Sequence, residues 1–133
     1  EQFESQARSA AAGSLLDSVE EHDGHGLLIA AVGEQAPDDL RALAFQLRDQ
    51  LGSGIGVLGA TNGGKGALIG FVSEELIGAG LSAGELIAPA ARILGGGGSR
   101  DPQLAQAGGP NGSEIEAALE QARATAREAL LAL

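Results

Sequence analysis

The sequence predicts a mixed α/β domain in which a small sheet of three to four strands packs against helices. Three observations predict it: short apolar runs bounded by glycine, apolar residues at helical spacing between those runs, and an Asn-Gly-Gly turn joining two of them. With 133 residues, 44% of them hydrophobic, the chain can bury a core in one domain. It contains no Cys, so no disulfide contributes to its stability.

The N-terminal residues 3–22 are predicted to form a helix. Their apolar residues recur every four positions: Phe3, Ala7, Ala11, Leu15 and Val19. We expect residues 1–22 to be the end of a helical linker or oligomerisation segment, and residues 23–133 to form the globular domain. The chain begins with Glu1 rather than Met, so we expect it to be a fragment of a longer protein.

The first strand is predicted at Leu27–Val32, a continuous apolar run that suits a strand buried on both faces. A helix follows from Pro37 to Leu51, with acidic residues at its start and leucines at helical spacing. The next apolar run, Ile55–Thr61, is a second strand. A strand–helix–strand order permits these two strands to pair in parallel.

A hairpin turn is predicted at Asn62–Gly66, because Asn and Gly accept the positive φ of tight turns, and Ala67–Val72 is its returning, antiparallel strand. Ser82 and Glu85 have the spacing of a capping box for a further helix. Pro89 interrupts that helical pattern, so we expect either a kink there or a helix that restarts.

The stretch Gly95–Gly112 is a glycine-rich connection, with a short fourth strand expected near Gln103–Ala107. Ser113 and Glu116 have the spacing of a second capping box. The helix that they open is predicted to end near Leu131.

The formal net charge of -10 argues against broad, nonspecific attraction to a polyanion. Any contact with a nucleic acid must therefore be local. Lys65, the only lysine, lies on the glycine-rich turn, where it could reach a phosphate. Arg92 precedes the glycine run, and we expect Lys65, Arg92 and Arg100 to share one surface.

The most informative segment is the run of four glycines at 95–98, followed by Ser99 and Arg100. Ordered glycines allow the backbone to approach another group closely, and exposed amides can bind an anion. Arg100 adds donors that suit phosphate. On composition alone, a flexible linker explains the run equally well.

The same segment ends in Ala-Gln-Ala-Gly-Gly at residues 105–109. Glycine run, basic residue, Pro-containing tetrad and this tail together resemble the C-terminal domain of alanyl-tRNA synthetase. The resemblance extends from Leu27 through Gly109, over the strands, the Asp-Asp-Leu-Arg helix and the Asn-Gly-Gly-Lys turn. In that family the basic residue directly precedes the proline, whereas here Asp101 separates Arg100 from Pro102.

The resemblance implies an accessory domain without a catalytic centre, which grips the outer corner of tRNA(Ala) for the aminoacylation and editing domains of a cytoplasmic parent enzyme. It implies no cofactor in this domain, with ATP, Mg and Zn confined to upstream parts, and dimerisation through the preceding helix. The residues that match its signature are Gly95, Gly96, Gly97, Gly98, Arg100, Gln106, Gly108 and Gly109.

Two other functions stay open. The acidic charge and the Ala-rich terminal helices suit a self-association module. The glycine run also resembles the small nucleic-acid-binding domain of DHH-type phosphoesterases. A metal site at His22 and His25 is not expected, because no third ligand accompanies them. Ser73 is not expected to be a nucleophile, since no histidine base is near it in sequence. No apolar run is long enough for a membrane span.

Overall fold

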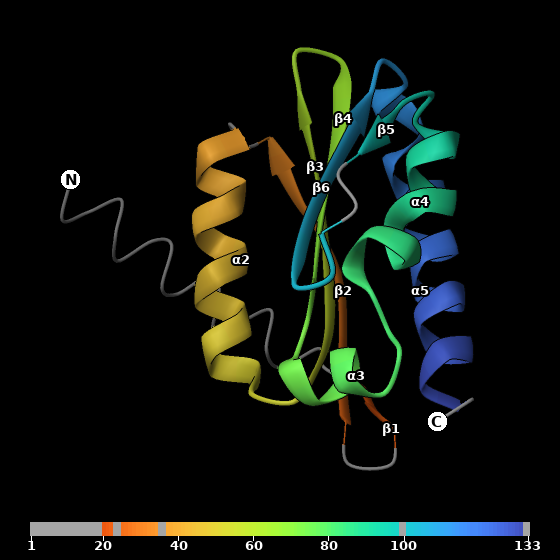
Figure 1. Ribbon diagram of the computed structural model, residues 1–133. Helices are drawn as coiled ribbons and strands as arrows, with labels where there is room; N and C mark the ends of the chain where they lie inside the picture. Colours follow the sequence, from red (N-terminus) through yellow and green to blue (C-terminus); the bar gives the residue numbers. More distant parts are fainter. Residues whose placement is uncertain (1–19, 23–24, 35–36, 99–100, 132–133) are drawn as a thin grey trace, which may run out of the picture.

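The computed structural model describes residues 20–22, 25–34, 37–98 and 101–131. It is a three-layer arrangement in which one sheet lies between a single helix on one face and two long helices on the other (Figure 1). In chain order the elements are β1 (Glu20–His22), β2 (His25–Glu34), α2 (Pro37–Leu51), β3 (Gly54–Asn62), β4 (Lys65–Val72), α3 (Glu74–Gly78), α4 (Ala83–Ile93), β5 (Gly97–Gly98), β6 (Leu104–Gly109), the 3₁₀ turn η1 (Gly112–Glu114) and α5 (Ile115–Leu131).

The predicted mixed α/β fold is confirmed. The strands follow the order β1-β2-β3-β4-β6-β5. Strand β2 pairs with β3 in parallel, through the crossover helix α2, and β3 pairs with β4 antiparallel across the predicted turn. The expected fourth strand is β6, which pairs antiparallel with β4.

Two short strands were not expected, so the described residues form six strands instead of three or four. Strand β5 consists of two glycines, which have no side chains whose alternation could predict a strand. Strand β1 corrects the prediction of a helix up to residue 22, because Glu20–His22 pairs antiparallel with β2. Sheet pairing across the tight connection at His22 and His25 overrides the four-residue apolar spacing there. The rest of the expected helix, residues 3–19, lies outside the described residues.

The two capping boxes do not form as predicted. Ser82 is the N-cap of α4, but its side chain makes no capping hydrogen bond. Instead, the first amides of α4, those of Ala83 and Gly84, donate to the carbonyl oxygens of Pro102 and Asp101, each at 3.0 Å. Helix α5 begins at Ile115, after η1, so Ser113 lies inside the 3₁₀ turn.

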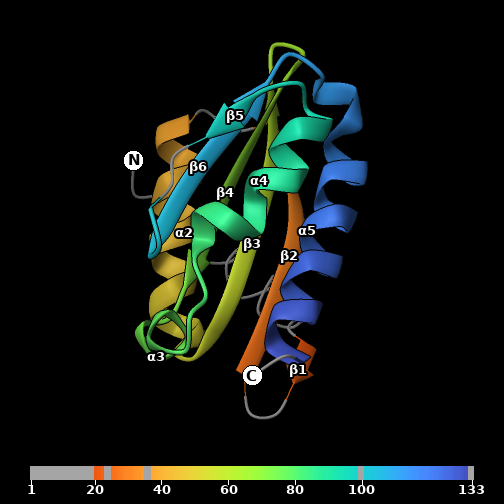
Figure 2. The same ribbon diagram turned by 45° about the vertical axis from the view of Figure 1, so that its right-hand side comes forward.

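Helix α4 is continuous from Ala83 to Ile93 with Pro89 inside it, so it does not restart at the proline. Its first turn is attached to the chain that leads into β6, through the two hydrogen bonds of Ala83 and Gly84. The far end of α4 therefore points toward the same end of the molecule as the β3–β4 turn (Figure 2).

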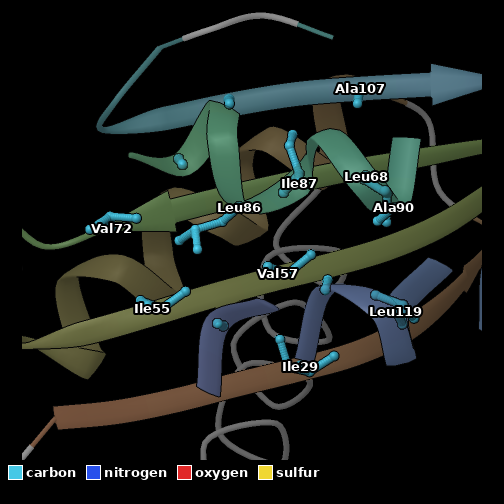
Figure 3. Packing of buried hydrophobic residues seen from close by; sticks show 14 of the residues in the cluster. Ile29, Ile55, Val57, Leu68, Val72, Leu86, Ile87, Ala90, Ala107 and Leu119 are labelled. Carbon is cyan, nitrogen blue, oxygen red and sulfur yellow. The ribbon is translucent and has the colours of Figure 1, made fainter. Parts of the chain in front are cut away.

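The sheet separates two hydrophobic clusters. The larger lies under α4 and α5, where Val57 and Leu68 pack against Ile87 and Leu119 (Figure 3). The smaller lies under α2 and includes Phe71, which is 1% exposed. Gly56 lies opposite Phe71 on the neighbouring strand, and a Cβ on Gly56 would collide with the ring. These clusters hold β3 and β4 in the register that places their connecting turn at one end of the molecule.

Candidate nucleic-acid interface

The β3–β4 turn forms one end of the molecule. Asn62 pairs with Lys65, and the two residues between them, Gly63 and Gly64, have φ of 59° and 85°. Both values lie in the left-handed region, which strongly favours glycine. Lys65 is the first residue of β4 and is exposed. The turn therefore presents an ammonium group at the tip of the sheet.

Hydrogen bonds fasten this turn to the segment that follows β6. The amide of Gly112 donates to the Gly64 carbonyl oxygen at 3.0 Å. The amide of Asn111 donates to the Leu94 carbonyl oxygen, at the end of α4, at 2.9 Å. A Cβ on Gly112 would lie 2.5 Å from the Gly64 oxygen, so the approach requires glycine. The turn, the end of α4 and the start of η1 thus meet at one end (Figure 1).

The glycine run begins by ending α4. Gly95 has a φ of 84°, and its amide donates to the Arg92 carbonyl oxygen at 3.0 Å. The amide of Gly96 donates to the Ala91 oxygen at 3.1 Å. Both bonds satisfy carbonyl groups at the helix end. These two amides are consequently occupied, so an anion at this loop would depend on other donors.

The two halves of the glycine signature are neighbouring strands. Gly97 pairs with Gly108, and Gly98 pairs with Ala107. A Cβ on Gly96 would collide with the Gly108 oxygen, whereas a Cβ on Gly97 would meet nothing within 4 Å. The run is therefore part of the sheet, which the flexible-linker interpretation did not predict, and its glycines permit close backbone approach.

The same requirement applies at two more glycines of the signature. A Cβ on Gly98 would collide with the Gln106 oxygen, and one on Gly109 with the Leu94 oxygen. Side chains at these positions would separate β5 from β6, or β6 from the end of α4. The glycines at positions 96, 98 and 109 thus have a structural cause in close backbone approach.

A groove on the α2 side of β6 contains Lys65. Side chains alternate along a strand, so Lys65 and Ala67 of β4 lie on the face of the sheet against which α2 packs. Gln106 and Gly108 of β6 lie on the same face. The groove has a volume of about 720 Å³. It is lined by Asn62, Gly63, Lys65, Gly66, Ala67, Gly108, Gly109 and Pro110. We call it the Lys65 groove; among these lining residues Lys65 alone is charged.

A second groove lies on the opposite side of β6, between α4 and β5. It has a volume of about 220 Å³. It is lined by Gly84, Ile87, Ala88, Ala91, Arg92, Gly96, Gly97, Gly98 and Ala107. We call it the Arg92 groove, because the exposed Arg92 is the one charged residue among those that line it. Each groove thus carries a cation and no acid, although the chain's net charge is -10.

The structure divides the predicted site residues between these grooves. Lys65 and Arg92 line different grooves, so the single shared surface expected for them is wrong in that respect. Arg100 lies outside the described residues. Gln106 is half-buried on β6.

Sequence reasoning missed several residues of the Lys65 groove, among them Asn62, Ala67 and Pro110. For Asn62, the predicted turn carried a signal, because a residue paired with Lys65 across a tight turn must lie beside it. For Ala67 and Pro110 the sequence carried none, since apolar residues that line a groove look like core or loop residues.

The structure also places His25 and Ser73, which were considered in the sequence for metal binding and catalysis. The described residues contain no group of three His, Cys, Asp or Glu side chains that could hold a metal ion. The Nδ1 atom of His25 is 2.9 Å from the Ser53 hydroxyl, and the Ser73 hydroxyl accepts a hydrogen bond from the Gly54 amide at 3.1 Å. Among the helices described, none has the length and hydropathy of a membrane span.

Comparison with known proteins identifies the family. The DHHA1 domain matches residues 24–128. The alanine–tRNA ligase of Bacillus subtilis (strain 168) is 41% identical over 108 residues, which are 81% of this chain and 12% of that protein. The ligase of Anaeromyxobacter dehalogenans (strain 2CP-C) is 40% identical over 130 residues, which are 98% of this chain and 14% of that protein.

A solved structure agrees with these relatives. The crystal structure of the C-Ala domain from Aquifex aeolicus alanyl-tRNA synthetase has a TM-score of 0.69 and 27% sequence identity, covering 81% of this chain and 96% of that one. The chain spans only 12% to 14% of the length of the ligases compared. The resemblance seen in the sequence is confirmed over most of the chain, and this chain belongs to the DHHA1 domain family.

Proposed function

We propose that this chain is an accessory, non-catalytic domain of a cytoplasmic alanine–tRNA ligase, and that it binds the outer corner of tRNA(Ala). In this role it would hold one tRNA while other domains of the parent enzyme aminoacylate and edit it. The relatives named above, all alanine–tRNA ligases, support the parent enzyme. The observation that carries the RNA-binding role is the pair of grooves beside β6.

The charge distribution supports RNA at these grooves rather than elsewhere. Lys65 and Arg92 each stand in a groove without an acidic neighbour among its lining residues. At the other end of the molecule, the groove beside α3 has Arg48 together with Asp49, Glu74 and Glu75. Phosphate groups are attracted to isolated cations and repelled by such an acidic rim.

The shape of the site also suits a nucleic-acid backbone. Where β5 pairs with β6, three of the four paired residues are glycines, and the fourth is Ala107. A sugar–phosphate backbone can therefore come close to the protein main chain there. Contacts of this kind position an RNA by its shape and do not read its sequence.

Replacing Lys65 with alanine is expected to weaken tRNA(Ala) binding without changing stability. Each duplex phosphate that a cation neutralises makes the decrease of log K with log salt steeper by about 0.9. The variant should lose one such phosphate contact. Its affinity at 0.1 M salt should therefore be lower by a factor of about eight. Fluorescence anisotropy of labelled tRNA(Ala) with the 133-residue chain, at several salt concentrations, measures both quantities.

The matched control is Arg41→Ala, which removes one positive charge from an exposed position on α2, outside both grooves. Its salt slope should stay at the value of the unchanged chain. If both variants show the same reduction in affinity and slope, general electrostatic attraction explains the binding, and the Lys65 groove has no special part in it.

A further inference from the structure

The edge of the sheet formed by β5 and β6 lies between two cations on opposite faces. Lys65 is on the side of α2, because side chains alternate along β4 and both Phe71 and Ala67 pack in the cluster under α2. Arg92 is on α4, which packs against the other face of the sheet. Figure 2 shows β6 and β5 at this edge, with α4 on one side and α2 on the other. A single layer of sheet therefore separates the Lys65 groove from the Arg92 groove.

This layer is almost bare on the α2 side. One row of paired residues runs across β4, β6 and β5, from Ala67 through Gly108 to Gly97. Residues paired directly across strands point to the same face, so the whole row faces the α2 side. A Cβ on Gly97 would meet nothing within 4 Å. A nucleic-acid backbone can thus lie on the main chain from Lys65 out to the edge of the sheet.

The α4 side of the same layer carries one methyl group where β5 pairs with β6. Gly98 pairs with Ala107, and both face α4, because a Cβ on Gly98 would lie 2.5 Å from the Cβ of Ala107. Both residues line the Arg92 groove. Side chains between two facing sheets hold their backbones about 10 Å apart. Where glycines replace such side chains, groups on the two sides of one strand pair can lie closer to each other.

The edge also presents one backbone amide to a ligand. The Val72 amide donates to the Gln103 carbonyl oxygen at 3.0 Å, so Gln103 bonds toward β4. Residues of an antiparallel strand direct their N–H and C=O groups alternately to the two neighbouring strands, so Ala107 also bonds toward β4 and Gly108 toward β5. Gly98, the partner of Ala107, therefore directs its N–H away from β6. This donor supplements Arg92, in the groove that Gly98 also lines.

The placement of the two cations favours one class of RNA. A single strand reaches both grooves only by turning back around β5, whereas two backbone segments that lie side by side reach them without a bend. Base-paired and folded RNA presents such segments on the two sides of a groove. Each segment then meets one cation, Lys65 or Arg92, with no acidic residue among those that line its groove.

We infer that the β5–β6 edge inserts between two phosphate backbones of a folded RNA. Lys65 contacts one backbone, and Arg92 with the Gly98 amide contacts the other. This inference rests on the proposed function, and it adds the number of strands that the site holds and the reason why an unpaired strand binds less well. An unpaired strand engages one cation at a time, whereas a folded RNA engages both.

Salt titrations of Lys65→Ala, Arg92→Ala and the double variant test whether both cations act at once. On tRNA(Ala), each replacement should make the decrease of log K with log salt shallower by about 0.9, and both together by about 1.8. The affinity at 0.1 M salt should fall about eightfold in each single variant and about sixtyfold in the double variant. On an unstructured oligouridylate, the double variant should lose only about fivefold in affinity and about 0.7 in slope, the effect of one phosphate on a single strand.

The outcomes separate this inference from the proposed function. A double variant that binds tRNA(Ala) no more weakly than the weaker single variant overturns the inference, as does an equal loss on oligouridylate and tRNA(Ala). Additive losses on tRNA(Ala) support it, also where the unchanged chain does not bind oligouridylate. An unchanged chain that binds no tRNA(Ala) overturns the proposed function as well. The matched control, Lys65→Arg with Arg92→Lys, keeps both charges and should retain the slope of the unchanged chain.

Cleavage of bound tRNA(Ala) by tethered iron–EDTA locates the two backbones directly. The chain has no Cys, so Asn62→Cys in the Lys65 groove and Ala88→Cys in the Arg92 groove each provide one attachment site. The control is Gln121→Cys, at an exposed position on α5 outside both grooves. We expect the two groove positions to cut two runs of nucleotides that are not continuous in the RNA sequence. One continuous run cut from both positions, or the same cuts from Gln121, would overturn the inference.

Discussion

Phe71→Ala is expected to lower the free energy of unfolding by about 3 to 5 kcal/mol, the usual cost of removing a buried phenyl ring. The Phe71 ring is 1% exposed, packs in the α2-side cluster and lies against Gly56, where no side chain can fill the space. A domain of this size is stable by roughly 5 to 15 kcal/mol, so a large part of its stability would be lost. Urea denaturation followed by circular dichroism measures the change.

Phe45→Ala is the matched control, since it deletes the same ring from the outer face of α2. Phe45 is 40% exposed and lies 5.0 Å under the Arg48 guanidinium. Removing this exposed cation–π interaction and the partial burial should cost no more than about 1 kcal/mol. Equal destabilisation in both variants would contradict the described packing of the smaller cluster.

Gly98→Ala is expected to destabilise the domain by about 1 to 3 kcal/mol, because the new methyl group must push against the neighbouring strand. Its Cβ would collide with the carbonyl oxygen of Gln106 and lie 2.5 Å from the Cβ of Ala107. Strand β5 forms one wall of the Arg92 groove. Displacing β5 should therefore also weaken tRNA binding.

Gly97→Ala tests the same strand without the collision, since a Cβ there meets nothing within 4 Å. We expect a stability change within about 1 kcal/mol, as for Gly-to-Ala substitutions at compatible positions. Thermal and urea unfolding of both variants provide the comparison. The structural account of the glycine run would be contradicted if Gly97→Ala were as destabilising as Gly98→Ala.

The elements that could be predicted are those whose sequence pattern extends over several residues. Helix α2 begins and ends where the leucine spacing and Gly52 indicated, and the positive φ at Gly63 and Gly64 is what an Asn-Gly-Gly turn requires. Strand β5 could not be predicted, since two glycines have no periodicity and pair only because β6 returns beside them. Glu20–His22 became a strand through its contact with β2, which no local pattern encodes.

For the candidate site, the sequence pointed to the glycine signature, Lys65 and Arg92, but it indicated neither their geometry nor the groove residues Asn62, Ala67 and Pro110. The signature at Gly95–Gly98 and Gly108–Gly109 was identified by resemblance, and the structure supplies a physical cause, close backbone approach, for the glycines at 96, 98 and 109. The sequence could not reveal that Gly95 and Gly96 use their amides to end α4. Nor could the sequence show that Lys65 and Arg92 lie on opposite sides of the sheet. The side on which Lys65 lies depends on strand alternation, and the side on which Arg92 lies depends on where α4 packs.

We propose that tRNA(Ala) contacts the end of the domain formed by the β3–β4 turn, β5 and β6. Amide NMR spectra of the ¹⁵N-labelled chain, titrated with tRNA(Ala), test it most directly. The largest shifts are expected at residues 62, 63, 65–67, 96–98 and 107–109, which line the Lys65 and Arg92 grooves. Shifts concentrated instead at Arg48, Gly52 and Ser73, beside α3 at the opposite end, would contradict the claim.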